Sequence, residues 1–373
     1  MANYRILLTG GGTGGHIYPL VAVAQKLPLG SDLRYFGDPE EFREYLQQSG
    51  IKIYKIASSK WRRYFSIQNF IDIFKFLWSL TQGLWKIFWF MPDVAFSKGG
   101  PGALAISLVC RFYRIPLVIH ESDTTPGLTN KLSAGGARKI DLAFAEAHKH
   151  FANFKKAEIN IVGQPIRAEL LSEESGSEAK KSFGFEPSTS LVLVMGGSQG
   201  AETINDFILN NLANLLNKFQ ILHIVGPKNH PEYKREFDFV SQKMDKSLLK
   251  RYRYEVYLTD NLRSAYDASD IIISRAGSGS IFEIAAKGKP SVIIPLPTSA
   301  NNHQEKNAYA YVESGAAIMI EEENLLENLF INEVSKILSD NNTYSKMSAA
   351  ANSFYKTDAA EKIASDIMEL ASK

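Results

Sequence analysis

Cysteine, net charge and long apolar runs are all scarce in this chain of 373 residues. The one cysteine, Cys110, excludes an intramolecular disulfide and a cysteine-rich metal site, and its apolar neighbours predict that it packs in the core. No window reaches the roughly 18 uncharged apolar residues of a membrane-spanning helix. Residues Met1 to Arg5 lead directly into a strand pattern without the layout of a signal peptide, so we expect a cytoplasmic protein.

The overall composition is that of an ordinary globular protein. Hydrophobic residues make up 45% and charged residues 22%, which excludes disordered, collagenous and fibrous classes. At about 150 residues per domain, the length predicts two domains.

The net charge of +2 conceals an asymmetry between the two halves. Residues 1 to 165 hold 20 basic and 12 acidic residues, a balance of +8, whereas the remainder holds 22 and 28, a balance of −6. This difference predicts that the first half faces something anionic, either a membrane surface or nucleic acid.

Short apolar runs alternate with helical patterns along the chain. The strands expected from these runs are Arg5 to Thr9, Leu33 to Phe36, Val94 to Phe96, Leu117 to His120, Leu142 to Phe144, Ile159 to Val162, Leu191 to Met195, Ile221 to Val225, Glu255 to Leu258, Ile271 to Ser274 and Ser291 to Pro295. Such alternation predicts an α/β fold with two doubly wound parallel sheets. The polar stretch 171–178 indicates a nearby boundary, which divides the chain into domains 1–165 and 166–354. The final helix, within 355–373, could return to the first domain.

Two glycine-rich turns stand at corresponding places, each after the first strand of its domain. Gly10 to Gly15 satisfies G-x-G-x-x-G, and Asp38 follows the next strand, so a nicotinamide or flavin site is one interpretation. A second is that backbone N–H groups at a helix N-terminus bind an anion, and a third is a tight turn without a ligand. Domains of this kind bind ligands beyond the carboxyl ends of their strands, so two of them facing each other would enclose a cleft.

His16 follows the first turn directly. The positive end of a helix lowers the pKa of an imidazole, and a neutral imidazole can accept the proton of a hydroxyl nucleophile. His16 is therefore a candidate general base, although a lone histidine is more often structural.

The segment Ser274 to Gly288 repeats the pattern of strand end, small-residue loop and helix. Ser278, Gly279 and Ser280 can offer donors to a diphosphate, with Glu283 accepting both hydroxyls of a ribose. The alternative is a capping box, in which Ser280 caps the helix and Glu283 reaches back to the backbone. The amides of Gln304 and Asn307, past another strand end, suit sugar hydroxyls.

Residues Trp61 to Met91 hold all four tryptophans, with Asp72 as the only acidic residue. Aromatic and basic side chains together favour the interface of an anionic membrane, although packing on the first sheet would explain the same pattern. Nucleic acid is not expected as a partner, because no recognition-helix or RNA-binding signature occurs.

Several motifs in one order resemble the MurG family of peptidoglycan N-acetylglucosaminyltransferases. They are Gly11 to Pro19, His120 to Asp123 with Pro126 to Lys131, Gly163 to Arg167, Gly196 to Ala201, and Arg275 through His303 to Ala308. The resemblance implies a GT-B fold and inverting transfer of N-acetylglucosamine from its UDP donor to the C4 hydroxyl of undecaprenyl-diphosphate-MurNAc-pentapeptide. It implies a peripheral enzyme on the inner face of the cell membrane.

The resemblance also implies roles for single residues. It places Thr13, Gly14 and Gly15 near the donor sugar and the acceptor, with His16 or Asp123 as the base. Positions matching the donor site are Arg167 and Ser198 near phosphate, Thr259 beside uracil, Glu283 on ribose and Gln304 on the sugar. No cofactor is expected, and no Asp-x-Asp motif near these loops indicates an essential metal.

Three alternatives stay open at this point. One is a UDP-sugar transferase acting on another lipid-linked acceptor, and another is a non-catalytic protein that binds a nucleotide sugar. The third is a dehydrogenase, which leaves the second-half loops unexplained.

Overall fold

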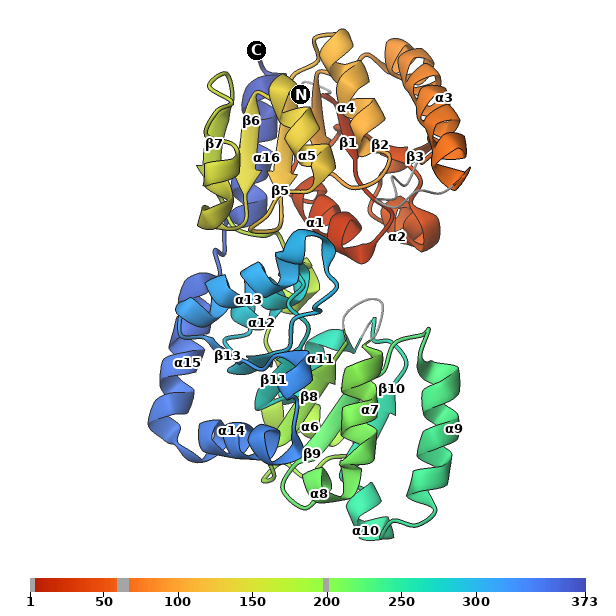
Figure 1. Cartoon of the computed structure of the whole chain (residues 1–373). Helices are drawn as coiled ribbons and strands as arrows, with labels where there is room; N and C mark the ends of the chain where they lie inside the picture. The colour runs from red at the N-terminus through yellow and green to blue at the C-terminus, as the bar shows by residue number, and fades with distance from the viewer. Residues whose placement is uncertain (1–3, 59–66, 197–200, 260) are drawn as a thin grey trace. The chain divides into compact units, whose positions relative to one another are not determined.

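The computed structural model describes residues 4–58, 67–196, 201–259 and 261–373. The chain forms two compact units, each with its own parallel sheet (Figure 1). The first contains Met1–Arg167 and Lys356–Lys373, and the second contains Ala168–Tyr355. Arg167, which the expected boundary assigns to the second domain, therefore belongs to the first unit.

The first unit is built on a seven-stranded sheet with the order β3-β2-β1-β4-β5-β6-β7. Its strands are β1 (Arg5–Thr9), β2 (Asp32–Gly37), β3 (Lys52–Lys55), β4 (Val94–Ser97), β5 (Leu117–Glu121), β6 (Lys139–Leu142) and β7 (Glu158–Ile161). All neighbouring strands are parallel, so their carboxyl ends meet at one edge. The strand order reverses between β1 and β4, and ligands of doubly wound sheets bind at such a point.

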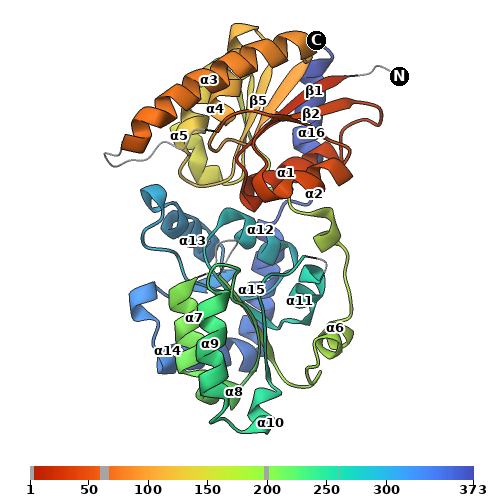
Figure 2. The ribbon, with the colours of Figure 1, turned by 90° about the vertical axis from the view of Figure 1, so that its right-hand side faces the viewer.

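Helices cover both faces of this sheet (Figure 2). Successive β1 residues therefore face different cores: Ile6 and Leu8 pack with α1, α2 and α16, whereas Leu7 packs with α3 and α4. Burial on both faces explains why these strands are continuous apolar runs. The helices are α1 (Gly14–Ala24), η1 (Glu40–Phe42), α2 (Arg43–Gln48), α3 (Ile67–Phe90), α4 (Ala103–Phe112), α5 (Leu128–Ser133), η2 (Ala134–Gly136), η3 (Ala145–His150) and α16 (Ala359–Ala371). Cys110 is fully buried in α4, which confirms its expected place in the core.

The second unit has a six-stranded parallel sheet with the order β10-β9-β8-β11-β12-β13. Its strands are β8 (Leu191–Met195), β9 (Gln220–Ile224), β10 (Tyr252–Glu255), β11 (Ile271–Ser274), β12 (Ser291–Ile293) and β13 (Ala317–Met319). Within this unit α7 and α9 lie on one side of the sheet, and α6 and α11 lie on the other (Figure 2). The helices are η4 (Ala168–Leu171), α6 (Gly176–Ser182), α7 (Glu202–Asn210), α8 (Leu212–Leu216), α9 (His230–Ser241), α10 (Lys246–Leu249), α11 (Leu262–Ala268), α12 (Ser278–Ala286), η5 (Ala300–Asn302), α13 (His303–Glu313), η6 (Glu322–Asn324), α14 (Glu327–Ser339) and α15 (Asn341–Phe354).

The two sheets agree with the expected α/β class, but four strands differ from the expected positions. The runs Leu142 to Phe144 and Glu255 to Leu258 are wrong as strands, because β6 and β10 begin three residues earlier, at Lys139 and Tyr252. Charged residues in these two strands hide them from an apolar pattern. β3 and β13 are not expected from the sequence, since both are short strands at a sheet edge.

Ion pairs hold the C-terminal helix against the first unit. The ammonium of Lys139, only 4% exposed in β6, donates to Asp366 at 2.5 Å and to Glu369 at 2.6 Å. Ile363 and Ile367 of the same helix are fully buried against the sheet. Because a buried ammonium requires partners, α16 completes the first unit both electrostatically and by packing.

Candidate active site

Within the first glycine turn, Gly10 to Gly15, Thr13 is the N-cap residue of α1. Its carbonyl accepts hydrogen bonds from the N–H groups of His16 at 2.9 Å and Ile17 at 3.0 Å. The Thr13 hydroxyl lies 2.9 Å from Nδ1 of His16 and so fixes the imidazole rather than a backbone N–H. The exposed Gly15 has no atom within 4 Å of where its Cβ would lie, so this part of the turn presents open backbone.

His16 is held between the first turn and the loop after β4. A Cβ on Gly100, whose φ is +84°, would lie 2.9 Å from Nε2 of His16. Burial, and secondly the positive charge of Lys98, lower the pKa of His16 to about 4. The expected direction is confirmed, and burial with a neighbouring lysine is its main cause. The imidazole is therefore neutral at pH 7.

Sequence reasoning missed two charged residues at this edge, Lys98 and Glu121. Lys98 follows β4, is 2% exposed and donates from its ammonium to the hydroxyl of Ser122. Glu121 ends β5 and is 4% exposed. Only their position in the sequence could have identified them. Lys98 directly follows an apolar strand and Glu121 ends one, and both therefore lie at the ligand-binding edge of the sheet.

The carboxylate of Glu121 anchors the loop that carries Asp123. It accepts from the N–H of Asp123 at 3.0 Å, the N–H of Gly127 at 3.2 Å and the amide of Asn130 at 2.9 Å. Burial, followed by the charge of Asp123, raises the pKa of Glu121. His16 and Asp123, the two candidate bases, thus both lie at the carboxyl edge of the first sheet, linked through Lys98.

The first turn is poorly suited to a dinucleotide. A Cβ on Gly12 would lie 2.8 Å from the side chain of Glu40 and 2.8 Å from the carbonyl oxygen of Asp38. Acidic and carbonyl groups there repel a pyrophosphate. The carboxylate of Asp38 pairs with Lys55 at 3.3 Å, which competes with the ribose contact that a dehydrogenase requires.

Arg167 ends the sequence of the first unit before the chain enters the second. It is 7% exposed, and its guanidinium lies 4.3 Å from the ring centre of Tyr18 in α1. Tyr18 in turn meets Phe42 and Tyr45 edge to face. The aromatic contact orients the guanidinium through a cation–π attraction.

In the second unit, the small-residue loop after β11 leads directly into α12. Gly277 is the N-cap, and Ser278, Gly279 and Ser280 form the first helical turn. The capping-box alternative is wrong, because Ser280 lies inside the helix rather than at its cap. First-turn N–H groups have no intrahelical acceptor, and Gly279 has no atom within 4 Å of its Cβ position. The turn therefore offers open donors at the positive end of a helix.

Hydrogen bonds orient the side chains of Glu283 and Gln304. The Tyr266 hydroxyl donates to Oε2 of Glu283 at 2.9 Å. The N–H of Leu296 donates to Oε1 of Gln304 at 3.0 Å, so the side-chain oxygen is engaged with the loop after β12. Both side chains are partly exposed.

Asn307 braces the loop before α12 from within. It is fully buried, and its amide donates to the carbonyl of Ala276 at 3.2 Å. Because the side chain of Asn307 has no exposed surface, it cannot reach a ligand. The arrangement therefore does not favour the direct contact with a sugar that the sequence predicts. Thr259 is exposed in the loop after β10, and Ser198 lies outside the described residues.

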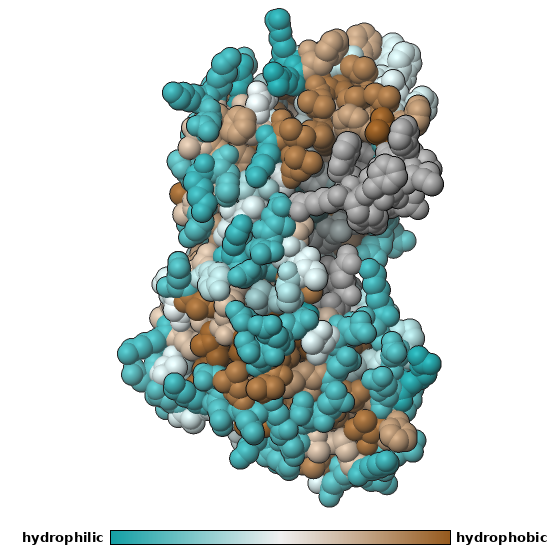
Figure 3. Space-filling view, in the orientation of Figure 1, coloured by the Kyte–Doolittle hydropathy of each residue, from teal (hydrophilic) through white to brown (hydrophobic). Residues whose placement is uncertain are grey.

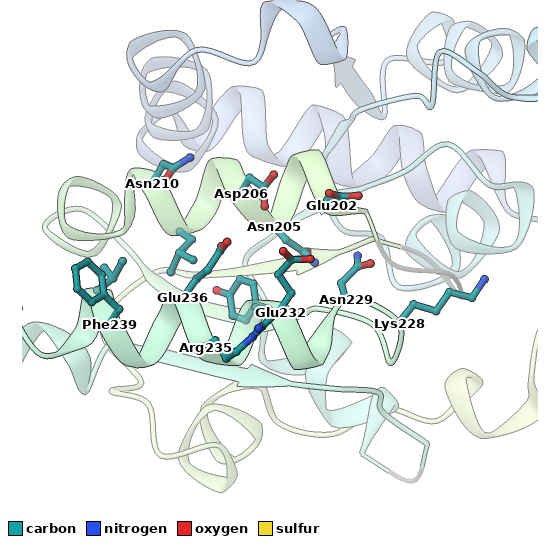
Figure 4. Close-up of a pocket in the computed structure, with 13 residues that line it drawn as sticks. Glu202, Asn205, Asp206, Asn210, Lys228, Asn229, Glu232, Arg235, Glu236 and Phe239 are labelled. Atoms are coloured by element: carbon teal, nitrogen blue, oxygen red, sulfur yellow. The ribbon is translucent and has the colours of Figure 1, made fainter.

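A groove of about 750 Å³ lies elsewhere in the second unit, between α7 and α9 (Figure 4). Glu202 and Asp206 face it from α7, and Glu232 and Glu236 face it from α9. Burial and these like charges raise the pKa of Asp206. Four carboxylates repel a phosphate-bearing ligand, so this groove is not the nucleotide site.

Among the described residues, no group of three or more His, Cys, Asp or Glu side chains is arranged to hold a metal ion.

An apolar surface covers the outer side of the first unit. Trp78, Trp85 and Trp89 of α3 are 60%, 66% and 69% exposed, and α3 packs on α4, which packs on α5. The α3–α5 patch comprises Phe74, Leu77, Trp78, Trp85, Phe88, Trp89, Phe112, Leu128 and Leu132. Figure 3 shows apolar residues gathered on this part of the unit. No described helix is both long and apolar enough to cross a membrane. Trp61, Arg62 and Arg63 lie outside the described residues.

Comparisons with known proteins point to one family. Residues 6–141 match the glycosyltransferase family 28 N-terminal domain, and residues 191–363 match its C-terminal domain. The chain is 36% identical over 345 residues to the UDP-N-acetylglucosamine--N-acetylmuramyl-(pentapeptide) pyrophosphoryl-undecaprenol N-acetylglucosamine transferase of Clostridium botulinum, covering 91% of this chain and 92% of the relative. It is 36% identical over 349 residues to the Clostridium tetani protein of the same name, covering 92% of each.

Two solved structures share the fold. The crystal structure of Acinetobacter baumannii MurG has a TM-score of 0.73 at 22% identity and covers 98% of this chain and 99% of its own. The UDP complex of S. aureus MnaA has a TM-score of 0.69 at 14% identity, covering 99% of this chain and 98% of its own.

Proposed function

The chain belongs to the MurG family of glycosyltransferase family 28, and we propose that it catalyses the reaction for which its relatives are named. It transfers N-acetylglucosamine from UDP-N-acetylglucosamine to the C4 hydroxyl of the muramyl sugar in undecaprenyl-diphosphate-MurNAc-pentapeptide. The anomeric carbon is inverted, because the acceptor oxygen attacks as UDP leaves. The identity and coverage of the curated relatives support this assignment.

The main structural support for a nucleotide-sugar donor is the first turn of α12. Its unpaired N–H groups and its helix dipole favour a diphosphate, and the missing side chain of Gly279 lets phosphate oxygens approach. We assign Ser278, Gly279 and Ser280 to this contact. The charge that develops on the leaving UDP would be stabilised by the same donors, which raises the rate of transfer.

The neighbouring polar side chains fit the rest of the donor. The carboxylate of Glu283, which the Tyr266 hydroxyl orients, can accept hydrogen bonds from ribose hydroxyls, and Gln304 can donate its amide to the sugar. Asn307 acts through the backbone by fixing Ala276. Thr259 beside uracil, and Ser198 and Arg167 near phosphate, stay predictions from the family resemblance.

We assign the acceptor and the proton transfer to the carboxyl edge of the first sheet. Attack needs a base to remove the proton of the C4 hydroxyl, and a neutral His16 or an ionised Asp123 can accept it. The open backbone beside Gly15 leaves room for a sugar next to His16, and the Thr13 hydroxyl sets the position of the imidazole.

The α3–α5 patch is proposed as the surface that meets the membrane. Exposed tryptophans prefer the interface between headgroups and acyl chains, and exposed Lys75, Arg111, Arg114 and Lys131 on the same helices or beside them attract anionic lipid. A peripheral position on the inner face of the membrane would bring the enzyme to an acceptor that is anchored by its undecaprenyl chain.

A transfer assay with Glu283→Gln tests the donor assignment. The variant keeps the shape of the side chain but weakens its hydrogen bonds to ribose, so we expect the KM for UDP-N-acetylglucosamine to rise about 10- to 100-fold, corresponding to about 1.5–3 kcal/mol. Glu313→Gln, an exposed carboxylate at the end of α13, is the matched control and should leave KM unchanged. Competition by UDP but not by ADP or NAD is expected. An unchanged KM in Glu283→Gln would remove this residue from the donor site.

Flotation with vesicles tests the membrane assignment. Replacing Trp85 and Trp89 together by serine removes two large apolar side chains, so binding to phosphatidylglycerol vesicles should fall by about tenfold or more. Phe239→Ser, which removes an aromatic side chain that is 62% exposed in the second unit, should have no effect. Equal flotation of all three proteins would contradict the proposed surface.

A further inference from the structure

Lys98 is a buried lysine in the middle of the first unit's binding edge. Its N–H donates to the carbonyl of Thr9 at 2.9 Å, so the β1–β4 pairing continues one residue past β4. Gly10 separates it from His16, since a Cβ on Gly10 would lie 3.4 Å from Cβ of Lys98 and 3.6 Å from Cβ of His16. With only 2% of its surface exposed, its ammonium requires partners within the protein.

The partners of the ammonium come from β5 and the loop after it. The Ser122 hydroxyl accepts its hydrogen bond, and the carboxylates of Glu121 and Asp123 supply negative charge. Burial lowers the pKa of Lys98, and the two carboxylates act against that shift. Three N–H donors point at Glu121 and, with Lys98, favour its ionised form, although burial and the charge of Asp123 have the larger effect and raise its pKa.

The charge of Lys98 also acts on two histidines, His16 in α1 and His120 in β5. This charge lowers the pKa of both, after the larger effect of burial. Nε2 of His120 is engaged with the carbonyl of Gly163 at 2.9 Å, deep in the fold and fully buried. His16 is partly exposed and can therefore contact a substrate, whereas His120 cannot. The charge of Lys98 is thus relevant to the reaction only through His16.

We propose that Lys98 is a positioning residue for the transfer reaction: its hydrogen bond to Ser122 holds the Asp123 loop, and its positive charge, placed beside His16 across Gly10, disfavours a second positive charge on that imidazole. This inference rests on the proposed function, because it assigns His16 and Asp123 to the acceptor. A protonated His16 could not accept the proton of the acceptor hydroxyl.

The titration of His16 distinguishes a positioning role of Lys98 from a role in packing alone. In the wild type, NMR titration should show His16 unprotonated down to about pH 5, with its signal assigned by His16→Gln among the seven histidines. In Lys98→Met, which keeps the length of the side chain without its charge, His16 should titrate at least about one pH unit higher. Lys98→Arg should retain the low value, and Lys149→Met is the exposed control.

The acid limb of kcat/KM for transfer should move with the titration of His16. A wild-type His16 that titrates near 6.5, or a Lys98→Met variant whose rate falls by the same factor at every pH, would overturn the inference. If Lys98→Met does not fold, a wild-type His16 that titrates near 6.5 still overturns the inference. The NMR titration of His16 does not depend on the transfer assay. A folded wild-type protein that transfers no sugar would therefore refute the proposed function without affecting the titration result.

Discussion

The carboxyl edges of the two sheets are built from different chemistry. In the first unit, ionisable side chains crowd the edge, with Lys98 and Glu121 buried and His16 made neutral by its surroundings. In the second unit, α12 begins at the carboxyl edge of the sheet with Ser278, Gly279 and Ser280 and offers backbone N–H groups. The difference indicates a division of labour: buried ionisable groups can move a proton, whereas a helix N-terminus binds a phosphate without titrating.

Charge outside the two sites follows the same division. The first half of the sequence carries +8 and the exposed α3–α5 patch, whereas the second carries −6 and the acidic groove between α7 and α9. A surface that meets anionic lipid should be basic and apolar, and only the first unit has both properties.

The largest effect is expected from His16→Ala. Removal of a general base lowers kcat by about 10²- to 10⁴-fold, and donor KM should stay near the wild-type value because we assign the donor site to the second unit. Asp123→Asn, measured beside it, identifies the base, since the variant with the larger loss of kcat removes the group that accepts the proton. A His16→Ala enzyme with normal kcat and weakened UDP binding would reverse the assignment of the two units.

A smaller effect is expected from Asn307→Ala in the second unit. The change removes a buried hydrogen bond to Ala276, so the free energy of unfolding should fall by about 1–3 kcal/mol. The loop before α12 should also loosen, which raises donor KM without changing the pH profile of the first unit. Denaturant titration and steady-state kinetics measure both effects, with Gln242→Ala on the exposed end of α9 as control. A changed pH profile with an unchanged donor KM would contradict the separation of roles.

The smallest effect is expected from Asp141→Asn, which tests the cost of burying ionisable groups in the first unit. Burial, and secondly the charge of Asp366, raise the pKa of Asp141 well above its usual value. The unfolded chain therefore loses this proton first, so the contribution to stability is complete below about pH 4 and is lost as pH rises toward the folded-state pKa.

An asparagine cannot ionise, so the Asp141→Asn variant should gain stability over the wild type as the pH rises. We expect on the order of 1 kcal/mol at pH 8 and a smaller difference at pH 5, measured by chemical unfolding at both values. Asp238→Asn, whose carboxylate is 53% exposed and paired with Lys234, should show no such trend. A gain of equal size at both pH values would show that ionisation of Asp141 is not the cause.

The sequence predicts the architecture well wherever strands are buried on both faces. All five residues of β8 are buried, so Leu191 to Met195 is a continuous apolar run. β6 was misplaced because it contains Lys139 and Asp141, whose burial depends on α16 more than 200 residues later in the chain. β3 has a lysine at each end and only two partly buried residues, Ile53 and Tyr54, between them, which is too little for a periodic signal.

The site was predicted where glycines and small residues mark a turn, as at Gly10 to Gly15 and Ser278 to Ser280. Lys98 and Glu121 were missed, because nothing in the local pattern shows that a charged side chain is buried and paired across two strands. The environment of Asn307 was missed for a related reason. Its partner Ala276 is distant in sequence, so an amide that braces a loop cannot be distinguished there from one that binds a sugar.

A backbone NMR titration with UDP tests the division between the two edges most directly. The account predicts that the amide signals of Ser278, Gly279 and Ser280 shift on binding, whereas those of Gly14, Gly15 and His16 stay in place. Shifts confined to the glycine turn of the first unit, or to Glu202 and Glu236 at the acidic groove, would contradict it.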